Sequence, residues 1–283
     1  MTMKERWAIW SDLGKIRITV AVTLSTLTGY LLHSESFTWH SILPVLGVFL
    51  IAASSAALNQ YQERNHDAKM ERTQNRPLPA GTISKQYAIN YVLITGIVGS
   101  VILYFSSNWT SLFLAWLTLF WYNGVYTPMK RVSIFAVIVG SVIGALPPMI
   151  GYTSAGGSWF AGDILLVAFF FFIWQVPHFI LLVLKLGEQY RMAGYPVITD
   201  YIEEQQAKRI IFTWMTGTVF SAFLLVIFQV IHHPLLIGLL SLFSLSLLIA
   251  SRTLIQEQVQ KFRFRAVFMN INLFLLGIMM LLM

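Results

Sequence analysis

Residues 40–81 read HSILPVLGVFLIAASSAALNQYQERNHDAKMERTQNRPLPAG, an apolar run that passes directly into a polar, charged segment. The run from 40 to 62 is long enough for an α-helix to cross a bilayer, which takes about 20 mostly apolar residues. Similar runs recur along the whole chain, so the sequence predicts an all-α, polytopic membrane protein with nine transmembrane helices in one domain, residues 1–283. The expected spans are 16–33, 40–62, 86–106, 109–127, 134–152, 162–186, 208–230, 235–252 and 265–282.

The composition excludes several classes of protein. Of the 283 residues, 57% are hydrophobic and only 11% are charged, whereas a soluble domain carries roughly 25% charged residues. Soluble enzymes, nucleic-acid-binding modules and disordered chains are therefore excluded, in spite of the net charge of +7. The absence of cysteine rules out a disulfide framework and thiolate zinc sites.

The basic residues predict the orientation of the chain in the membrane. All 19 Lys and Arg fall in alternate inter-span segments or at the span ends beside them, namely 1–15, 63–85, 128–133, 187–207 and 253–264. Cytoplasmic loops carry such an excess, so we expect a cytoplasmic N-terminus and an outside C-terminus in a bacterial plasma membrane. The expected outside segments hold Glu35, Asp163, His33, His40, His232 and His233.

The polar segment after the second span carries an acidic repeat. Residues four apart share one face of a helix, and here they are Asn59, Glu63, Asp67 and Glu71. Arg72 and Arg76 form a second pair, and Pro77 is expected to end the helix. Mg²⁺ takes one or two carboxylates together with substrate phosphates, and arginine donates to phosphate oxygens. This pattern predicts a diphosphate–magnesium site, although a solvated loop with local salt bridges would show similar charges.

Two further stretches place polar groups at or in the membrane. Lys130 and Arg131 end the fourth span, where they could reach the same phosphate or simply anchor the topology. Pro147-Pro148 is expected to interrupt the fifth span, and Pro177 to break the sixth between Gln175 and His178. Polar groups at membrane depth need partners and are usually functional, but a lone histidine is more often a hydrogen-bonded packing residue.

These stretches together resemble a known family. N-x-x-x-(D/E)-x-x-x-D followed by E-R-T-x-N-R-P-x-P-A-G is similar to the first acidic motif of the UbiA superfamily of intramembrane prenyltransferases. Y-T-x-x-K-R, G-A-x-P-P-x-I-G and W-Q-x-P-H-F resemble its protoheme IX farnesyltransferase branch. The resemblance covers about residues 59–197. Glu63 replaces the commoner Asp, and Glu188 and Gln189 stand where the second motif usually has two acids, so one carboxylate is lost. Asp200 or Glu204 could compensate.

The resemblance implies an activity and a set of roles. It implies farnesyl transfer from farnesyl diphosphate to a vinyl group of heme b, giving heme O, under a cytoplasmic cap formed by loops 63–85 and 187–207. A heme A synthase or a terminal oxidase is a candidate protein partner. The implied Mg²⁺ ligands are Glu63, Asp67 and Glu188, with Asn59 orienting the diphosphate. The implied diphosphate-binding residues are Arg72, Arg76, Lys130 and Arg131, and the implied heme contacts are His178 and Gln175.

Two alternatives remain open at this point. The acceptor could be an aromatic quinone precursor, a reading that W-Q-x-P-H-F disfavours. The chain could instead be a membrane transporter, since broken helices and intramembrane polar groups also occur in transporters. The predicted charges cluster at one membrane face instead of the midplane, which favours an enzyme acting from one side.

Overall fold

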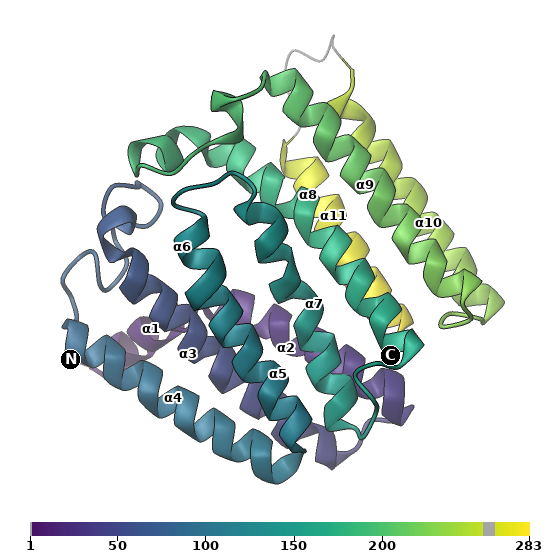
Figure 1. The fold of residues 1–283 in the computed structure, drawn as a ribbon, viewed down its shortest axis with the longest axis horizontal. Helices are drawn as coiled ribbons and strands as arrows, with labels where there is room; N and C mark the ends of the chain where they lie inside the picture. Colours follow the sequence, from purple (N-terminus) through teal and green to yellow (C-terminus); the bar gives the residue numbers. More distant parts are fainter. Residues whose placement is uncertain (1, 257–263) are drawn as a thin grey trace.

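The computed structural model describes residues 2–256 and 264–283, and this part of the chain forms a helical bundle (Figure 1). The short helix α1 lies beside the bundle, and the longer helices run roughly along one direction. Most connections are short, but the α3–α4 loop spans residues 68–84 and the α8–α9 loop spans 193–203. The helices are α1 (Met3–Leu13), α2 (Ile16–Ser34), α3 (Ile42–Asp67), α4 (Lys85–Ser106), α5 (Trp109–Phe120), α6 (Thr127–Met129), α7 (Ala136–Ser154), α8 (Gly162–Met192), α9 (Glu204–Ile227), α10 (Pro234–Ser251) and α11 (Phe264–Leu281). Shorter turns are η1 (Trp39–Ser41), η2 (Trp121–Tyr126), η3 (Ile198–Asp200) and η4 (Arg252–Leu254), of which η2 is a π-helix and the others are 3₁₀-helices.

Seven helices in the described residues are long and apolar enough to cross a membrane: α3, α4, α7, α8, α9, α10 and α11. The two other expected spans correspond to α2 and to α5 with η2 and α6. The chain is thus a multi-pass membrane protein, and nine spans stay a prediction. Residues 257–263 of the expected inside segment 253–264 lie outside the described residues.

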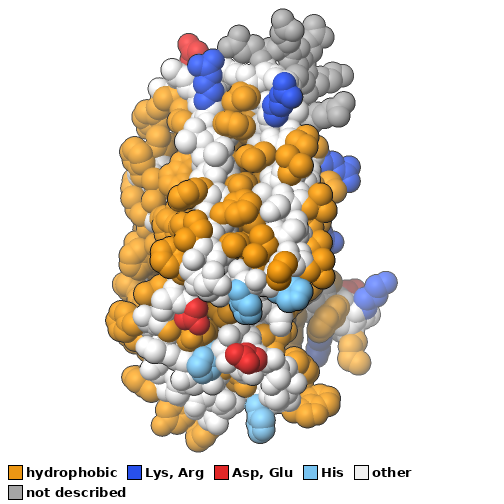
Figure 2. All heavy atoms as spheres, turned by 90° about the vertical axis from the view of Figure 1, so that its right-hand side faces the viewer, with side chains coloured by type: hydrophobic (Ala, Val, Ile, Leu, Met, Phe, Trp, Pro, Cys, Tyr) orange, Lys and Arg blue, Asp and Glu red, His pale blue; other side chains and the backbone are white. Residues whose placement is uncertain are grey.

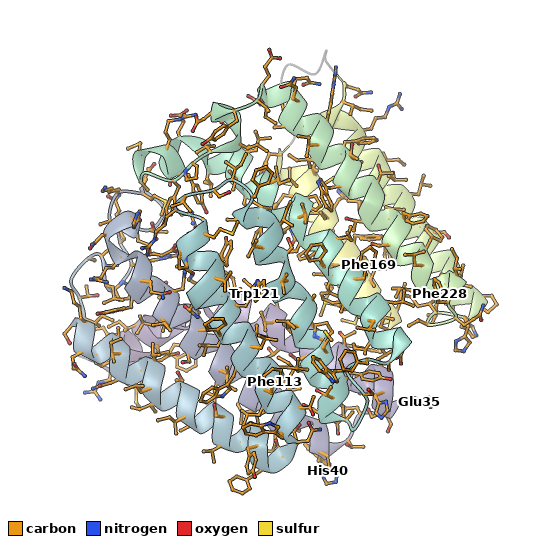
Figure 3. The ribbon with its side chains drawn as sticks, in the orientation of Figure 1. Glu35, His40, Phe113, Trp121, Phe169 and Phe228 are labelled. Carbon is orange, nitrogen blue, oxygen red and sulfur yellow. The ribbon has the colours of Figure 1, made fainter. Side chains whose placement is uncertain are left out.

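The outer surface of the bundle matches a lipid environment. Large apolar side chains are exposed along α4 and α10, including Phe105 at 81% and Leu242 at 61%. On the face in Figure 2, hydrophobic side chains cover the flanks of the helices. Lys and Arg lie near the upper end and along the right-hand edge, and His lies in the lower half together with acidic side chains. Figure 3 places Glu35 and His40 at the lower edge, away from the loops that join α3 to α4 and α8 to α9. The orientation of the two ends of the bundle in the membrane stays a prediction.

Helices α2 and α7 cross at a contact made by two glycines. A Cβ atom on Gly29 would overlap the backbone of Pro148, and one on Gly151 would overlap the carbonyl of Thr26. Small residues let membrane helices approach at backbone distance. The crossing fixes α7 against α2 in the middle of the bundle.

The prolines do not end their helices, contrary to the sequence expectation. Helix α7 runs without a break through Pro147 and Pro148, and α8 runs through Pro177. All three prolines are buried. Membrane helices tolerate proline because neighbouring groups and local adjustments take up the freed carbonyls, so the proline rule from soluble helices overestimates the disruption here.

The expected extension of the acidic helix is also wrong. Helix α3 ends at Asp67, so Glu71 lies in the following turns with its side chain exposed, off the acidic face. The Thr73 hydroxyl donates to the carbonyl of Asp67 at 2.9 Å and so satisfies a helix-terminal acceptor. In the turns that follow, Met70 packs against Ala193 and Tyr195, which brings the α3–α4 loop against the α8–α9 loop.

Candidate active site

The C-terminal end of α3 presents three polar side chains on one face. Asn59, Glu63 and Asp67 are 1%, 4% and 1% exposed, respectively, although all are polar. Their spacing of four residues places them one above another along the helix. Buried carboxylates need partners, and each of the two acids has a cation beside it.

Glu63 is paired with Lys130, which follows α6. The Lys130 Nζ atom lies 2.5 Å from Glu63 Oε1, and the Tyr195 hydroxyl donates to the same oxygen at 3.1 Å. Burial, the largest single influence, would lower the pKa of Lys130, but the Glu63 charge and hydrogen bond together with Tyr126 and Tyr190 raise it overall. Lys130 therefore carries its positive charge at the end of α3.

Asp67 is paired with Arg76 from the α3–α4 loop. The Arg76 Nη1 atom donates to Asp67 Oδ2 at 2.8 Å, and only 17% of the arginine side chain is exposed. The two ion pairs make a compact cluster of two acids and two cations. Such a cluster has donors for phosphate oxygens and acceptors for a cation on the same surface.

A third cation, Lys15, belongs to this cluster and was missed by the sequence analysis. Its Nζ atom donates to Asn59 Oδ1 at 2.7 Å, while Asn59 Nδ2 donates to Thr127 Oγ1 at 3.0 Å. Burial, with Arg76 nearby, lowers the pKa of Lys15 to about 7. Lys15 adopts a left-handed backbone with φ of 45°, which turns the chain between α1 and α2. A basic residue at the start of a span also serves as a topology anchor, so the sequence alone gave no reason to single it out.

The other expected diphosphate residues are placed differently. Arg131 donates from Nη2 to the carbonyl of Gln62 at 2.8 Å, and its Nε atom is buried without a partner. Arg72 has an exposed side chain, and its backbone N–H donates to Gln189 Oε1 at 3.3 Å. Gln189, near the end of α8, thus joins that helix to the α3–α4 loop by a hydrogen bond.

Glu188 is not brought to the acidic pair in this structure. Its side chain is 87% exposed and lies 2.6 Å from Arg191, which also contacts Asp200 at 2.5 Å. Glu204 pairs with Lys208. No group of three or more His, Asp or Glu side chains with metal-binding geometry occurs in the part of the chain that the structure describes. Among the described residues, the two carboxylates of α3 are therefore the buried acids of the cluster.

A mainly apolar cavity of about 390 Å³ adjoins the charged cluster. Lys130 and Tyr195 stand at its polar end, and Phe179 and Trp214 line it farther along. Its rim includes Phe135, Ile138 and Ile210, which are 64%, 40% and 38% exposed on the flank of the bundle. The cavity thus joins the charged cluster to the lipid-facing surface.

One wall of the cavity is aromatic. The rings of Tyr126 and Phe179 stack with centroids 5.9 Å apart and planes 6° from parallel, and Tyr122 continues the stack at 5.7 Å from Tyr126. Gly140 leaves room for this wall, since a Cβ there would lie 2.7 Å from the Tyr126 ring. Tyr122 and Tyr126 belong to the π-helix η2, a rare turn that is frequent at functional sites.

His178 and Gln175 lie on α8 but do not line this cavity. The imidazole packs between Trp174 and Phe268, with ring centroids 4.8 and 4.9 Å away, and its Nδ1 atom is buried without a hydrogen-bond partner. Gln175 packs against Gly144 of α7, where a Cβ would lie 2.5 Å from its Oε1 atom. His178 is therefore a half-buried residue whose Nδ1 atom is buried and makes no hydrogen bond.

Comparisons with curated proteins identify relatives over about two thirds or more of the chain. The chain is 33% identical over 222 residues to a protoheme IX farnesyltransferase of Nitratidesulfovibrio vulgaris, which covers 78% of this chain and 76% of that protein. It is 39% identical over 186 residues to one from Geobacter sulfurreducens, covering 65% of this chain and 67% of the relative. It is 35% identical to the mitochondrial protein of Yarrowia lipolytica over 69% of this chain, but spans only 41% of that protein's length.

Solved structures share the fold. A digeranylgeranylglyceryl phosphate synthase superposes with a TM-score of 0.76 at 15% identity, covering 98% of this chain and 97% of that one. A UbiA homolog from Archaeoglobus fulgidus bound to GPP and Mg²⁺ superposes with a TM-score of 0.67 at 13% identity, covering 97% and 99% of the two chains. The family model described as the UbiA prenyltransferase family matches residues 22–274. The chain therefore belongs to the UbiA prenyltransferase family.

Proposed function

We propose that this protein transfers a farnesyl group from farnesyl diphosphate to a vinyl group of heme b and so makes heme O. The observation that carries the proposal is the junction of a buried acid–base cluster with an apolar cavity, at Lys130. A prenyl diphosphate has the same division into a charged head and an apolar tail. The relatives named protoheme IX farnesyltransferase support heme b as the acceptor.

The diphosphate head would bind at the end of α3. Glu63 and Asp67 fit a role in holding Mg²⁺, because two carboxylates one helical turn apart suffice when phosphates and water supply the other ligands. Bound there, Mg²⁺ would neutralise the charge that develops on the leaving diphosphate. Lys130, Arg76 and Lys15 would exchange their present oxygen partners for phosphate oxygens.

Other predicted head-group residues have smaller or conditional roles in this proposal. Arg131 follows Lys130 directly in the chain, and its Nε atom, which has no hydrogen-bond partner, would donate to the diphosphate. Glu188 would serve as a third metal ligand only after release from Arg191. Arg72 would contribute positive charge from the exposed loop, and Asn59 would orient the head group.

The farnesyl tail would lie in the apolar cavity, against the wall of Tyr126 and Phe179. The bond between the farnesyl C1 atom and the diphosphate oxygen breaks, and the electron pair leaves with the diphosphate. The vinyl group of heme b attacks the allylic cation and forms the new carbon–carbon bond. Water then captures the cation left on the former vinyl group and loses a proton, which gives the hydroxyl of heme O. Facing aromatic rings stabilise such cations.

Heme b would contact His178 and Gln175 on α8, each of which lies one helical turn before a cavity-lining residue, Leu182 and Phe179, respectively. Support comes from the buried, unpartnered Nδ1 atom of His178, because a neutral imidazole nitrogen is a natural ligand of heme iron. A closely packed aromatic surround of Trp174 and Phe268 suits a flat macrocycle. This placement keeps the heme contact beside the farnesyl cavity, as attack of the vinyl group on the farnesyl C1 atom requires.

The same proposal includes the topology. Nine spans, a cytoplasmic N-terminus and an outside C-terminus would place the charged cluster at the cytoplasmic face, where farnesyl diphosphate is soluble. Loops 63–85 and 187–207 would cap the site, in a single domain covering residues 1–283. A bacterial plasma membrane is the proposed location, with a heme A synthase or a terminal oxidase as partner.

The proposal is tested with the purified full chain in lipid nanodiscs. We expect heme b, farnesyl diphosphate and Mg²⁺ to give heme O, detected by mass spectrometry, and we expect Asp67→Ala to abolish the product. Glu71→Ala is the matched control, because this acid lies outside helix α3 with its side chain exposed. Prenylation of an aromatic quinone precursor in place of heme b would contradict the acceptor, and substrate flux without chemistry would contradict the enzyme.

A further inference from the structure

We propose that Tyr195 is a positioning residue, which holds the Glu63 carboxylate in the orientation that binds the metal–diphosphate head. This inference rests on the proposed function for the identity of the head group. Tyr195 occupies the variable position between Gly194 and Pro196 of the second motif, where the sequence analysis assigned no role. In the structure its hydroxyl donates to Glu63 Oε1 at 3.1 Å, and the residue is only 4% exposed.

The local backbone explains why this side chain points to α3. Helix α8 ends at Met192, and Gly194 follows with φ of +84°, a left-handed conformation that glycine adopts at helix ends. The backbone N–H of Tyr195 then donates to the carbonyl of Tyr190 at 2.9 Å, which closes the turn. The reversal directs the next side chain back toward α3.

The loop after Tyr195 is held in place by an exposed ion pair between Arg191 and Asp200. Arg191 bridges Glu188 and Asp200, with nitrogen–oxygen distances of 2.6 and 2.5 Å. Asp200 Oδ2 also accepts from the backbone N–H of Val197 at 3.3 Å. Arg191 therefore fastens the loop that carries Tyr195 to the end of α8 through Asp200, and Glu188 pairs with Arg191 while the Tyr195 phenol contacts Glu63.

The ring of Tyr195 is fixed on two sides. It stacks on His66 with centroids 4.9 Å apart, and the Lys130 ammonium lies 5.0 Å from its centroid. A phenol is protonated near neutral pH, so the Tyr195 hydroxyl donates to the Glu63 carboxylate. A fixed neutral donor of this kind orients a carboxylate without neutralising it.

The positioning role of Tyr195 follows from which of the two Glu63 carboxylate oxygens it contacts. Lys130 and Tyr195 both contact Glu63 Oε1, which leaves Oε2 as the atom to face a cation. When Lys130 turns to a phosphate oxygen, Tyr195 remains as the donor that holds the carboxylate. Tyr195 also lines the apolar cavity, so the same side chain borders both the head and the tail of the substrate.

The test measures binding of farnesyl diphosphate by calorimetry, with Mg²⁺ and with a chelator, in the absence of heme. Tyr195→Phe removes one hydrogen bond to a charged group and keeps the ring, so we expect Mg²⁺-dependent affinity to fall about tenfold. In the presence of the chelator, the affinity of Tyr195→Phe for farnesyl diphosphate should stay within about twofold of the wild-type value. A purely structural role would lower the affinity equally with and without Mg²⁺. Tyr201→Phe, on the same loop but 66% exposed, is the matched control and should bind like the wild type.

A double-mutant cycle tests whether Tyr195 acts on affinity through its hydrogen bond to Glu63 or through a general effect on the structure. In a Glu63→Gln background, we expect the further loss caused by Tyr195→Phe to shrink to about twofold or less. An undiminished tenfold loss in that background, or wild-type affinity for Tyr195→Phe alone, would overturn the inference. Because no acceptor is present, failure to make heme O would contradict the proposed reaction and leave this result unaffected.

Discussion

Replacing Lys130 with methionine removes the cation that sits between the two halves of the proposed site. The Glu63 carboxylate, with 5% of its side chain exposed, would then be left with the Tyr195 hydroxyl and no charged partner within 4 Å among the described residues. Breaking a buried ion pair from one side costs about 3–5 kcal/mol, because the remaining charge is stranded. Since 18% of the Lys130 side chain is exposed to solvent, we expect the lower end, about 3 kcal/mol.

The double variant Lys130→Met/Glu63→Gln separates stability from catalysis. Removing both charges leaves no stranded carboxylate, so most of the lost stability should return. Turnover should not return, because the proposed phosphate-facing ammonium is missing in both variants, and we expect a loss of about 10²–10³ in kcat. Lys130→Arg keeps the charge and should lose less activity than Lys130→Met.

The assay pairs two measurements on the same nanodisc preparations. Unfolding midpoints report the stability of each variant, and heme O formed from heme b and farnesyl diphosphate reports turnover. If the double variant were as unstable as Lys130→Met, the stranded charge would not be the cause of the destabilisation. If Lys130→Met kept turnover within about threefold of the wild type, the ammonium would have no part in departure of the diphosphate.

Three other predictions follow from the geometry. Because the pKa of Lys15 is lowered to about 7, its charge is present below that pH and lost above it. Farnesyl diphosphate affinity should therefore fall between about pH 6 and about pH 9, and Lys15→Arg should flatten the profile when binding is titrated across this range. Gly151→Leu should destabilise the bundle by about 1–3 kcal/mol or more, because its side chain meets the Thr26 carbonyl. A thermal melt checks this against Gly238→Ala, whose added Cβ meets no atom within 4 Å. His178→Ala should weaken heme b binding at least about tenfold and leave farnesyl diphosphate binding unchanged, which a Soret-band titration and calorimetry would show.

Local features of this protein could be predicted from the sequence. The helical period alone places Asn59, Glu63 and Asp67 on one face, and the structure has all three buried on α3. Long apolar runs gave helices close to their expected limits, such as Lys85–Ser106 for 86–106. The distribution of charged residues predicted a membrane protein, because contact with lipid or with water directly limits where charged side chains can occur.

Features that depend on packing could not be predicted. Lys15 contacts Asn59 across 44 positions of the chain, and Tyr195 contacts Glu63 across 132. No local periodicity reports such contacts. Glu71 was misplaced because the end of α3 is decided by the loop after it, where Thr73 caps the carbonyl of Asp67.

The contacts of Arg191 with Glu188 and Asp200 show a limit of predicting site residues from motifs. Glu188 sits at an acid position of the second motif, yet in the structure it pairs with Arg191 and is largely exposed. The identity of a side chain at a motif position does not fix which way it points. A neighbouring arginine and Asp200 are enough to redirect it.

The cavity that begins at Lys130 and ends at the lipid-facing rim has a consequence for how the two products part. In the proposed reaction, diphosphate is released on the side of the charged loops and dissolves in water. The acceptor gains a chain of fifteen carbons, and each buried methylene favours the bilayer by about 0.8 kcal/mol. Diphosphate therefore leaves into water and the prenylated acceptor leaves into the bilayer. Dilution of diphosphate and retention of the acceptor in lipid both suppress the reverse reaction.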